Sequence, residues 1–200
     1  MRNYLFVILL LLICCKTSEE QKGIIPKDEN LDFRYEVLNQ LIDSDSLSYK
    51  QNSFIYSSTL KSVYLYENES YEPKTLGITL KYDSVFSQKD SAYYRNQEKK
   101  TFNFRFDKRK VKQKLQYATD EELHKLNEIK NSDFWSEFNK KYGNKCIRRF
   151  SVPFFNKDKT MCIVQNSVSC GYLNANGYTA IYKKINGEWK EIKSFDHWVS

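Results

Sequence analysis

The sequence is short of the residues that build common nucleotide-binding and metal-binding motifs. It has 200 residues, of which only six are Gly and two are His. The six Gly are scattered, which excludes a glycine-rich loop that cradles phosphates. A zinc site needs three or four Cys, His or carboxylate ligands at suitable spacing, and neither His124 nor His197 belongs to a CxxC or HxxxH pattern. We therefore expect neither a metal site nor a cofactor.

The sequence also lacks a long apolar run. The longest one, Leu5–Ile13, spans nine residues and follows Arg2. A membrane-spanning helix needs about 20 apolar residues, whereas the core of a signal peptide needs about 7–15. The segment is therefore predicted to be a signal peptide, with an uncleaved membrane anchor as an alternative.

The residues after this run resemble a bacterial lipobox, in which Leu precedes by three positions a Cys that is lipidated and becomes the new N-terminus. In Leu12-Ile13-Cys14-Cys15 we predict Cys15 as that residue, because Leu12 then has the expected offset and small Cys14 precedes the cut. Lipobox patterns prefer Gly, Ala or Ser before the cut. Lipidation of Cys14 and a plain secretory signal are the alternatives. Several acyl chains, such as palmitate, would anchor the protein stably, since one chain alone binds marginally.

The predicted organisation has three parts. Residues 1–14 are a lipoprotein signal peptide, residues 15–30 are a flexible polar tether, and residues 31–200 form a single α+β domain. The 15 Tyr, 13 Phe and 3 Trp indicate a folded chain that favours sheet. The expected location is the cell envelope, with the lipoprotein anchored in a membrane and facing the periplasm or the cell surface.

Local signals predict four helices in the first two thirds of the chain. Apolar residues at helical spacing indicate one helix within residues 28–42. Patterns that resemble capping boxes open two more helices, at Ser87 and at Thr119. A fourth helix is expected to begin at Ser132 or Asp133 and to end at Gly143.

Short strands are expected between these helices. Residues 53–66 favour one or two strands, and residues 78–80 favour another. In residues 101–106, Phe102, Phe104 and Phe106 alternate with polar residues, which predicts a half-buried strand with the three rings on one face.

The last third of the chain predicts a four-stranded antiparallel meander. The strands are expected at residues 146–155, 161–170, 178–185 and 188–198, with turns at 156–160, 174–177 and 186–187. Asn186-Gly187 is the strongest hairpin signal, although apolar residues spaced by three leave a helical ending as the alternative. The predicted fold class is α+β, with N-terminal helices and short strands packed on a C-terminal four-stranded antiparallel meander.

The meander carries a pattern of the form Ser-x-Pro-x-Phe, Cys-Gly-x-Leu, Gly-x-Trp and Trp-x-Ser. Its matching residues are Ser151, Pro153, Phe155, Asp158, Cys170, Gly171, Leu173, Gly187, Trp189, Trp198 and Ser200. This segment resembles the C-terminal part of a family of uncharacterised lipoproteins common in Bacteroidota. Two positions depart from the family pattern, since Asn174 replaces a second Cys and Cys162 stands where the second strand has its small residue. The resemblance covers the last 50 residues and implies a compartment and a fold, but no activity.

Three cysteines follow the signal segment: Cys146, Cys162 and Cys170. Cys162 and Cys170 share a strand and lie roughly 26 Å apart, whereas a disulfide tolerates at most about 7 Å between Cα atoms. If the turn centres on Asp158, Cys146 faces Cys170, and we predict a disulfide between them in an oxidising compartment. A bulge at Pro153 would shift this register and prevent the bond. Cys162 is expected to be a small buried residue.

The formal net charge is +7, and basic residues concentrate in residues 99–114. Within this segment, Lys108, Arg109 and Lys110 are a candidate contact with anionic lipid headgroups. A solvated strand face followed by a polar loop is the plainer interpretation. The expected partners are the membrane, through the N-terminal lipid, and an envelope protein, a glycan or anionic headgroups. Nucleic acid is not expected, because an exported lipoprotein would not meet it in the cytoplasm.

No set of residues fills the roles of a catalytic site. The sequence has no Gly-x-Ser-x-Gly elbow and no recognisable motif around a nucleophilic Cys. The favoured hypothesis is therefore a non-enzymatic, lipid-anchored envelope protein with a binding or structural role, whose contact surface is the concave face of the meander. The alternative is a small envelope hydrolase in which Asp196 and His197 activate a Ser or Cys nucleophile.

Overall fold

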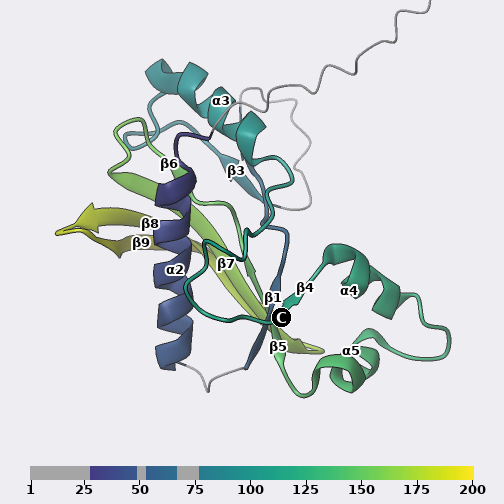
Figure 1. Ribbon diagram of the computed structural model, residues 1–200. Helices are drawn as coiled ribbons and strands as arrows, with labels where there is room; N and C mark the ends of the chain where they lie inside the picture. The colour runs from purple at the N-terminus through teal and green to yellow at the C-terminus, as the bar shows by residue number, and fades with distance from the viewer. Residues whose placement is uncertain (1–27, 49–52, 67–76) are drawn as a thin grey trace, which may run out of the picture.

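The computed structural model describes residues 28–48, 53–66 and 77–200, and a mixed β-sheet forms its centre (Figure 1). The sheet consists of β1 (Phe54–Ser57), β4 (Tyr117–Ala118), β5 (Cys146–Phe150), β6 (Phe154–Phe155), β7 (Met161–Gly171), β8 (Asn174–Ile185) and β9 (Glu188–Val199). Its order is β4-β1-β5-β7-β8-β9, and β6 also pairs with β7. Strands β5 to β9 run antiparallel, as the predicted meander does, whereas β1 and β4 extend the sheet in parallel.

Helices and a small second sheet cover both faces of this central sheet. They are α2 (Leu31–Ser48), the parallel pair β2 (Val63–Leu65) and β3 (Ile78–Leu80), the 3₁₀ turn η1 (Gln88–Asp90), α3 (Ser91–Thr101), α4 (Asp120–Asn127) and α5 (Phe134–Tyr142). Helix α2 packs across one face through apolar residues such as Leu38 and Ile42. The small sheet with α3 covers one part of the other face, and α4 with α5 covers a second part. The middle of β7 is consequently buried on both sides, with Cys162 and Val164 facing α2 and Ile163 facing the small sheet.

The helices agree well with their local sequence signals. Thr119 and Glu122 form the predicted capping box, in which each side chain accepts a hydrogen bond from the other residue's backbone N–H. Asp133 caps α5, and Gly143 ends it with a φ of +78°. The predicted capping box at Ser87 is wrong, because the Ser87 side chain makes no capping hydrogen bond, although a helix does follow.

The predicted strand at residues 101–106 is absent from the structure. Thr101 is the last residue of α3, and Asn103 adopts a positive φ of 55° that breaks the extended alternation. The three phenylalanines therefore do not share a face. Phe102 is 62% exposed, whereas Phe104 and Phe106 pack on the α2 cluster.

The meander differs from the prediction at two places. Its first strand is divided into β5 and β6 around Ser151–Pro153. This break is expected, because Pro153 has no backbone N–H to donate to a neighbouring strand. Strand β8 begins at Asn174, so the residues predicted as a turn are paired, and the chain reverses through Tyr172 and Leu173 instead. The hairpin at Asn186-Gly187 is confirmed, with both residues at positive φ, and β9 continues as a strand to Val199.

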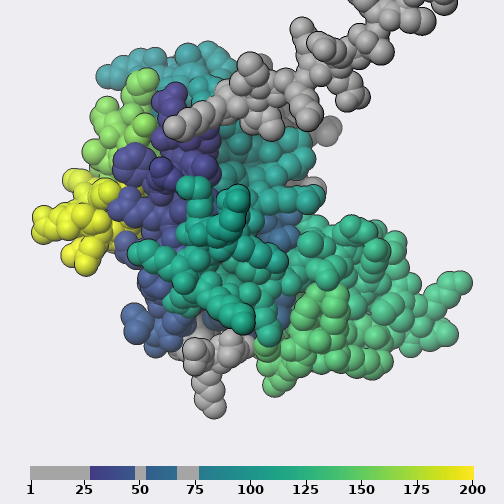
Figure 2. Space-filling model, in the orientation of Figure 1, coloured from purple at the N-terminus to yellow at the C-terminus, as the bar shows by residue number. Residues whose placement is uncertain are grey.

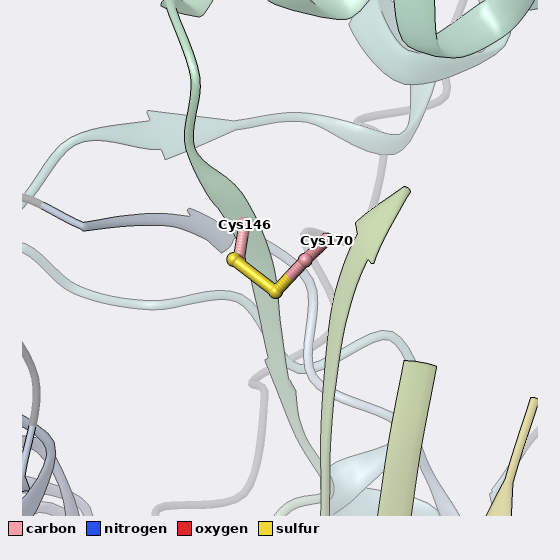
Figure 3. The surroundings of a disulfide bond; sticks show 2 residues. All are labelled: Cys146 and Cys170. Atoms are coloured by element: carbon pink, nitrogen blue, oxygen red, sulfur yellow. A yellow bond between two sulfur atoms is a disulfide. The ribbon is translucent and has the colours of Figure 1, made fainter. Parts of the chain in front are cut away.

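The structure contains the predicted disulfide between Cys146 and Cys170, which joins β5 to β7 (Figure 3). The expected effect of Pro153 was wrong, however. Phe155 pairs with Cys162 and Phe150 pairs with Asn166, so five steps along the first strand match four along β7. If the pairing of β6 with β7 continued into β5 without this extra residue, Ile147 would lie opposite Cys170. The irregularity around Pro153 therefore brings the two cysteines together.

Candidate functional site

A cavity of about 400 Å³ lies between α2 and the meander, and we call it the α2 cavity. From α2 it is lined by Gln40, Leu41, Ser44 and Asp45, and from the sheet by Arg148, Asn166, Val168, Asn176, Tyr178, Tyr182, Trp189 and Glu191. This is the meander face that α2 crosses (Figure 1). The sequence predicted the concave face of the meander as the contact surface and did not identify these residues as a site.

Helix α2 holds one wall of the cavity in a fixed position. Val37 and Ile42 are fully buried against the sheet, which orients the helix. Gln40 ties it to β9, because its amide donates to the Trp189 carbonyl and accepts a hydrogen bond of 2.8 Å from the Trp189 N–H. The distance between helix and strand is thus set by hydrogen bonds as well as by packing.

A buried ion pair forms the floor of the cavity. The Arg148 Nε donates to the Asp45 Oδ2 over 2.9 Å, and both residues are less than a tenth exposed. Tyr56 donates a further hydrogen bond of 3.2 Å to the same carboxylate oxygen. Burial raises the pKa of Asp45 above its ordinary value, while the charge of Arg148 acts in the opposite direction. Burial likewise raises the pKa of Tyr56, and the charge of Asp45 adds to that effect.

Two buried hydrogen-bond donors on residues that line the α2 cavity have no partner among the described residues. They are the side-chain nitrogens of Asn166 and Trp189. The orientation of the Asn166 amide follows from its neighbour, because its oxygen accepts a hydrogen bond of 3.2 Å from the Arg148 Nη1. A buried donor without a partner costs about 1–3 kcal/mol, so such groups are uncommon in native proteins.

Aromatic side chains and a carboxylate complete the wall formed by β8 and β9. The hydroxyls of Tyr178 and Tyr182 both point to the Glu191 Oε2, at 3.4 and 3.5 Å. Tyr178 also stacks on His197, with ring centroids 5.3 Å apart. The cavity therefore combines aromatic surface with a few polar groups, which is typical of sites for small molecules.

The pair Asp196 and His197 lies at a bulge of β9. Gly177 pairs with Trp198 and Thr179 pairs with Phe195, so both residues oppose Tyr178 alone. Asp196 lines a second cavity of about 500 Å³, between β3 and the other face of the meander, whose lining includes neither His197 nor any Ser or Cys. The lining of this cavity thus supplies neither a Ser nor a Cys nucleophile beside Asp196.

The free thiol of Cys162 is inaccessible. The residue is fully buried beneath α2, and burial raises the pKa of its thiol well above the usual range. The structure therefore gives Cys162 the packing role that the sequence predicted.

The basic residues Lys108, Arg109 and Lys110 lie in the segment that runs along α2 (Figure 2). Arg109 forms two hydrogen bonds of 2.9 Å with Asp107, and Lys110 pairs with Asp32 at 2.8 Å. Lys108 lies over the ring of Tyr117. Two of the three charges thus have a counter-ion within the protein.

The predicted signal peptide and Cys15 lie outside the described residues. Of the predicted tether, Asp28 and Asn30 are in contact with the domain, since Asp28 pairs with the buried Arg34 at 2.8 Å and Asn30 is buried beside Tyr93. None of the described helices combines the length and apolar character needed to cross a membrane. Residues 28–48, 53–66 and 77–200 also contain no group of three His, Cys, Asp or Glu able to hold a metal ion.

Comparison with protein-family models, with curated proteins and with solved structures finds no match to this chain.

Trp189 belongs to the meander pattern, but no residue of the α2 cavity was predicted from the sequence to form a site. Arg148 gave the clearest signal, because it stands in a strand between the apolar residues Ile147 and Phe150. Its partner Asp45 is 103 residues away, near the end of α2, and nothing in the sequence links the two.

Proposed function

We propose that this protein is a lipid-anchored envelope protein with a non-catalytic binding role, and that its ligand occupies the α2 cavity. The observation that carries this proposal is the pair of donors on Asn166 and Trp189 that have no partner in the described residues, in a cavity also lined by the buried Asp45–Arg148 pair. A ligand that accepts hydrogen bonds from these nitrogens would offset the cost of burying them. The resemblance to envelope lipoproteins and the lipobox pattern that ends at Cys15 support the location.

The cavity favours a small polar ligand that also has an apolar face. Its charged groups are Arg148 against Asp45 and Glu191, so it does not select strongly for either sign of charge. Tyr178, Tyr182 and Trp189 offer aromatic surface on which such a face can pack. A monosaccharide or disaccharide has both properties, and glycans were among the partners expected from the sequence.

Binding can be measured with Trp189 as the reporter. In a W135F/W198F background, Trp189 is the remaining tryptophan, and its fluorescence is followed while glucose, N-acetylglucosamine or chitobiose is added. We expect a saturable change with at least one sugar. The S44F variant should abolish this change, because Ser44 is exposed on α2 and lines the cavity. S46F is the matched control, since Ser46 is exposed on the same helix and does not line the cavity.

The absence of a saturable response to every sugar, or equal responses of S44F and S46F, would refute the proposed site. Chromatography of the recovered sugar tests the non-catalytic part, because a cleaved product would contradict it.

The anchor is tested separately, by labelling producing cells with an alkyne fatty acid and fractionating their membranes. The parent and C14S should be labelled and sediment with the membranes, whereas C15S should lose both properties. The reverse pattern would assign the lipid to Cys14, and an unlabelled parent would contradict the lipoprotein proposal.

A further inference from the structure

A third cavity, of about 210 Å³, lies against the sheet face opposite the α2 cavity, and we call it the Lys61 cavity. Arg148 and Arg149 are neighbours in β5, so their side chains leave the sheet on opposite faces, and Arg149 lines this third cavity. The other lining residues that matter here are Lys61, Asp120, Ser57, Thr59 and Ser62.

Backbone hydrogen bonds hold Lys61 next to the end of β5. The Lys61 N–H donates to the Phe150 carbonyl, and the Lys61 carbonyl accepts from the Val152 N–H, both over 2.9 Å. Lys61 also forms an isolated bridge with Ser151. The side chain therefore emerges beside Arg149 from a backbone position that the sheet determines.

The two cations in this cavity form no direct ion pair with a residue in the described ranges. Neither the Lys61 ammonium nor the Arg149 guanidinium forms an ion pair or a hydrogen bond with any residue in the described ranges. Burial lowers the pKa of both groups, and the charge of Arg149 lowers the pKa of Lys61 further. Asp120, the carboxylate of the lining, favours the charged form of Arg149 from a distance and accepts a hydrogen bond of 3.4 Å from Ser57.

We propose that the Lys61 cavity binds one tetrahedral oxyanion, which is inorganic phosphate or sulfate or the phosphoryl group of a small monoester. An oxyanion between Lys61 and Arg149 would accept charge-assisted hydrogen bonds from both and remove their mutual repulsion. Thr59 and Ser62 line the same space and carry hydroxyl donors, whereas the Ser57 hydroxyl already donates to the Thr59 carbonyl over 3.0 Å. Sites for drug-sized ligands measure about 300–1,000 Å³, so the smaller volume suits a single anionic group.

The test is a titration of the protein with sodium phosphate, sodium sulfate or methyl phosphate at constant ionic strength, against sodium chloride. Backbone amide NMR shifts and the melting temperature are recorded. In the parent, phosphate should shift the amide signals near Lys61 and Arg149 saturably and should raise the melting temperature. K61Q and R149Q should each weaken binding by at least about tenfold, since each removes one charge-assisted interaction.

Two further variants separate site-specific charge from general charge and from folding. K130Q removes one positive charge from an exposed position without a partner in the described residues, and it should bind phosphate like the parent. K61R keeps the charge and should keep the binding. Binding of methyl phosphate as well as phosphate would assign the site to phosphoryl groups of larger molecules, and binding of the inorganic ions alone would assign it to free anions. An unresponsive parent, or an equal loss in K130Q and K61Q, would overturn the proposal.

Discussion

Loss of the Cys146–Cys170 disulfide should lower the free energy of unfolding by about 3.4 kcal/mol. The two residues are 24 positions apart, and the entropy of closing a loop of that length in the unfolded chain gives this value at 25 °C. The native strands stay paired without the bond, because Ile147 to Phe150 form four further pairs with β7. For a domain of this size, the melting temperature should fall by about 7–14 °C.

The assay is urea unfolding, followed by circular dichroism with and without reductant. Reduction of the parent should lower the midpoint and also steepen the denaturant dependence, because the released unfolded chain exposes more surface. C146S/C170S should match the reduced parent and should not respond to reductant. C162A is the control, since Cys162 is free and any effect of its replacement should be equal under both conditions. If mass spectrometry shows complete reduction while the parent curve is unchanged, the reasoning is refuted.

Three other changes test the remaining structure. The Gln97 side chain forms hydrogen bonds of 2.9 Å with both the N–H and the carbonyl of Phe155. Q97A should therefore lower the free energy of unfolding by about 1–3 kcal/mol for each of these two backbone groups that it leaves unpaired. Urea unfolding measures this loss, and a total below about 1 kcal/mol would contradict the prediction. Burial raises the pKa of Asp45, so the native state binds that proton more readily than the unfolded chain does. As pH falls from the folded-state pKa of Asp45 towards its ordinary value of about 3.9, the free energy of unfolding of the parent should therefore rise relative to that of D45N. Unfolding curves at several pH values measure this difference, and the opposite trend would be inconsistent with a raised pKa. The triple replacement of Lys108, Arg109 and Lys110 by Gln should leave binding to phosphatidylglycerol vesicles nearly unchanged, because two of these charges are already paired within the protein. Each free charge at a membrane contributes about 1 kcal/mol to binding. A loss of vesicle affinity above about tenfold would therefore establish these residues as a membrane contact.

Elements set by a few adjacent residues were predictable from the sequence. The capping box of α4 and the Asn186-Gly187 hairpin belong to this class, because their geometry depends on residues no more than three positions apart. The α2 cavity belongs to the opposite class. It depends on contacts between Asp45 and Arg148 and between Gln40 and Trp189, which no local pattern encodes.

The segment Asn174–Gly177 shows how tertiary contacts override a local signal. Its composition predicts a turn, yet the structure pairs it on both sides, with β7 and with β9. Gly177 is needed there for a different reason. A Cβ at this position would lie 2.7 Å from the Trp198 side chain and 2.8 Å from the Asn166 carbonyl oxygen. The glycine therefore serves the close approach of β9 rather than a turn.

The buried polar groups of this fold differ in how completely they are paired, and this difference separates structural from functional candidates. Arg34 is fully buried, yet its side chain donates hydrogen bonds to Asp28, to Gln97 and to the Pro153 carbonyl. These polar groups are therefore paired within the protein, and their role is structural, because they connect α2, α3 and the start of β6.

The α2 cavity and the Lys61 cavity are not satisfied in this way. The first has two donors without a partner in the described residues, and the second has two cations that form no direct ion pair there. Two other buried atoms without partners in the described residues, the hydroxyls of Tyr117 and Tyr142, belong to residues outside the linings of these three cavities. An unpaired polar group points to a ligand where it coincides with a cavity, and among the three cavities that coincidence selects these two.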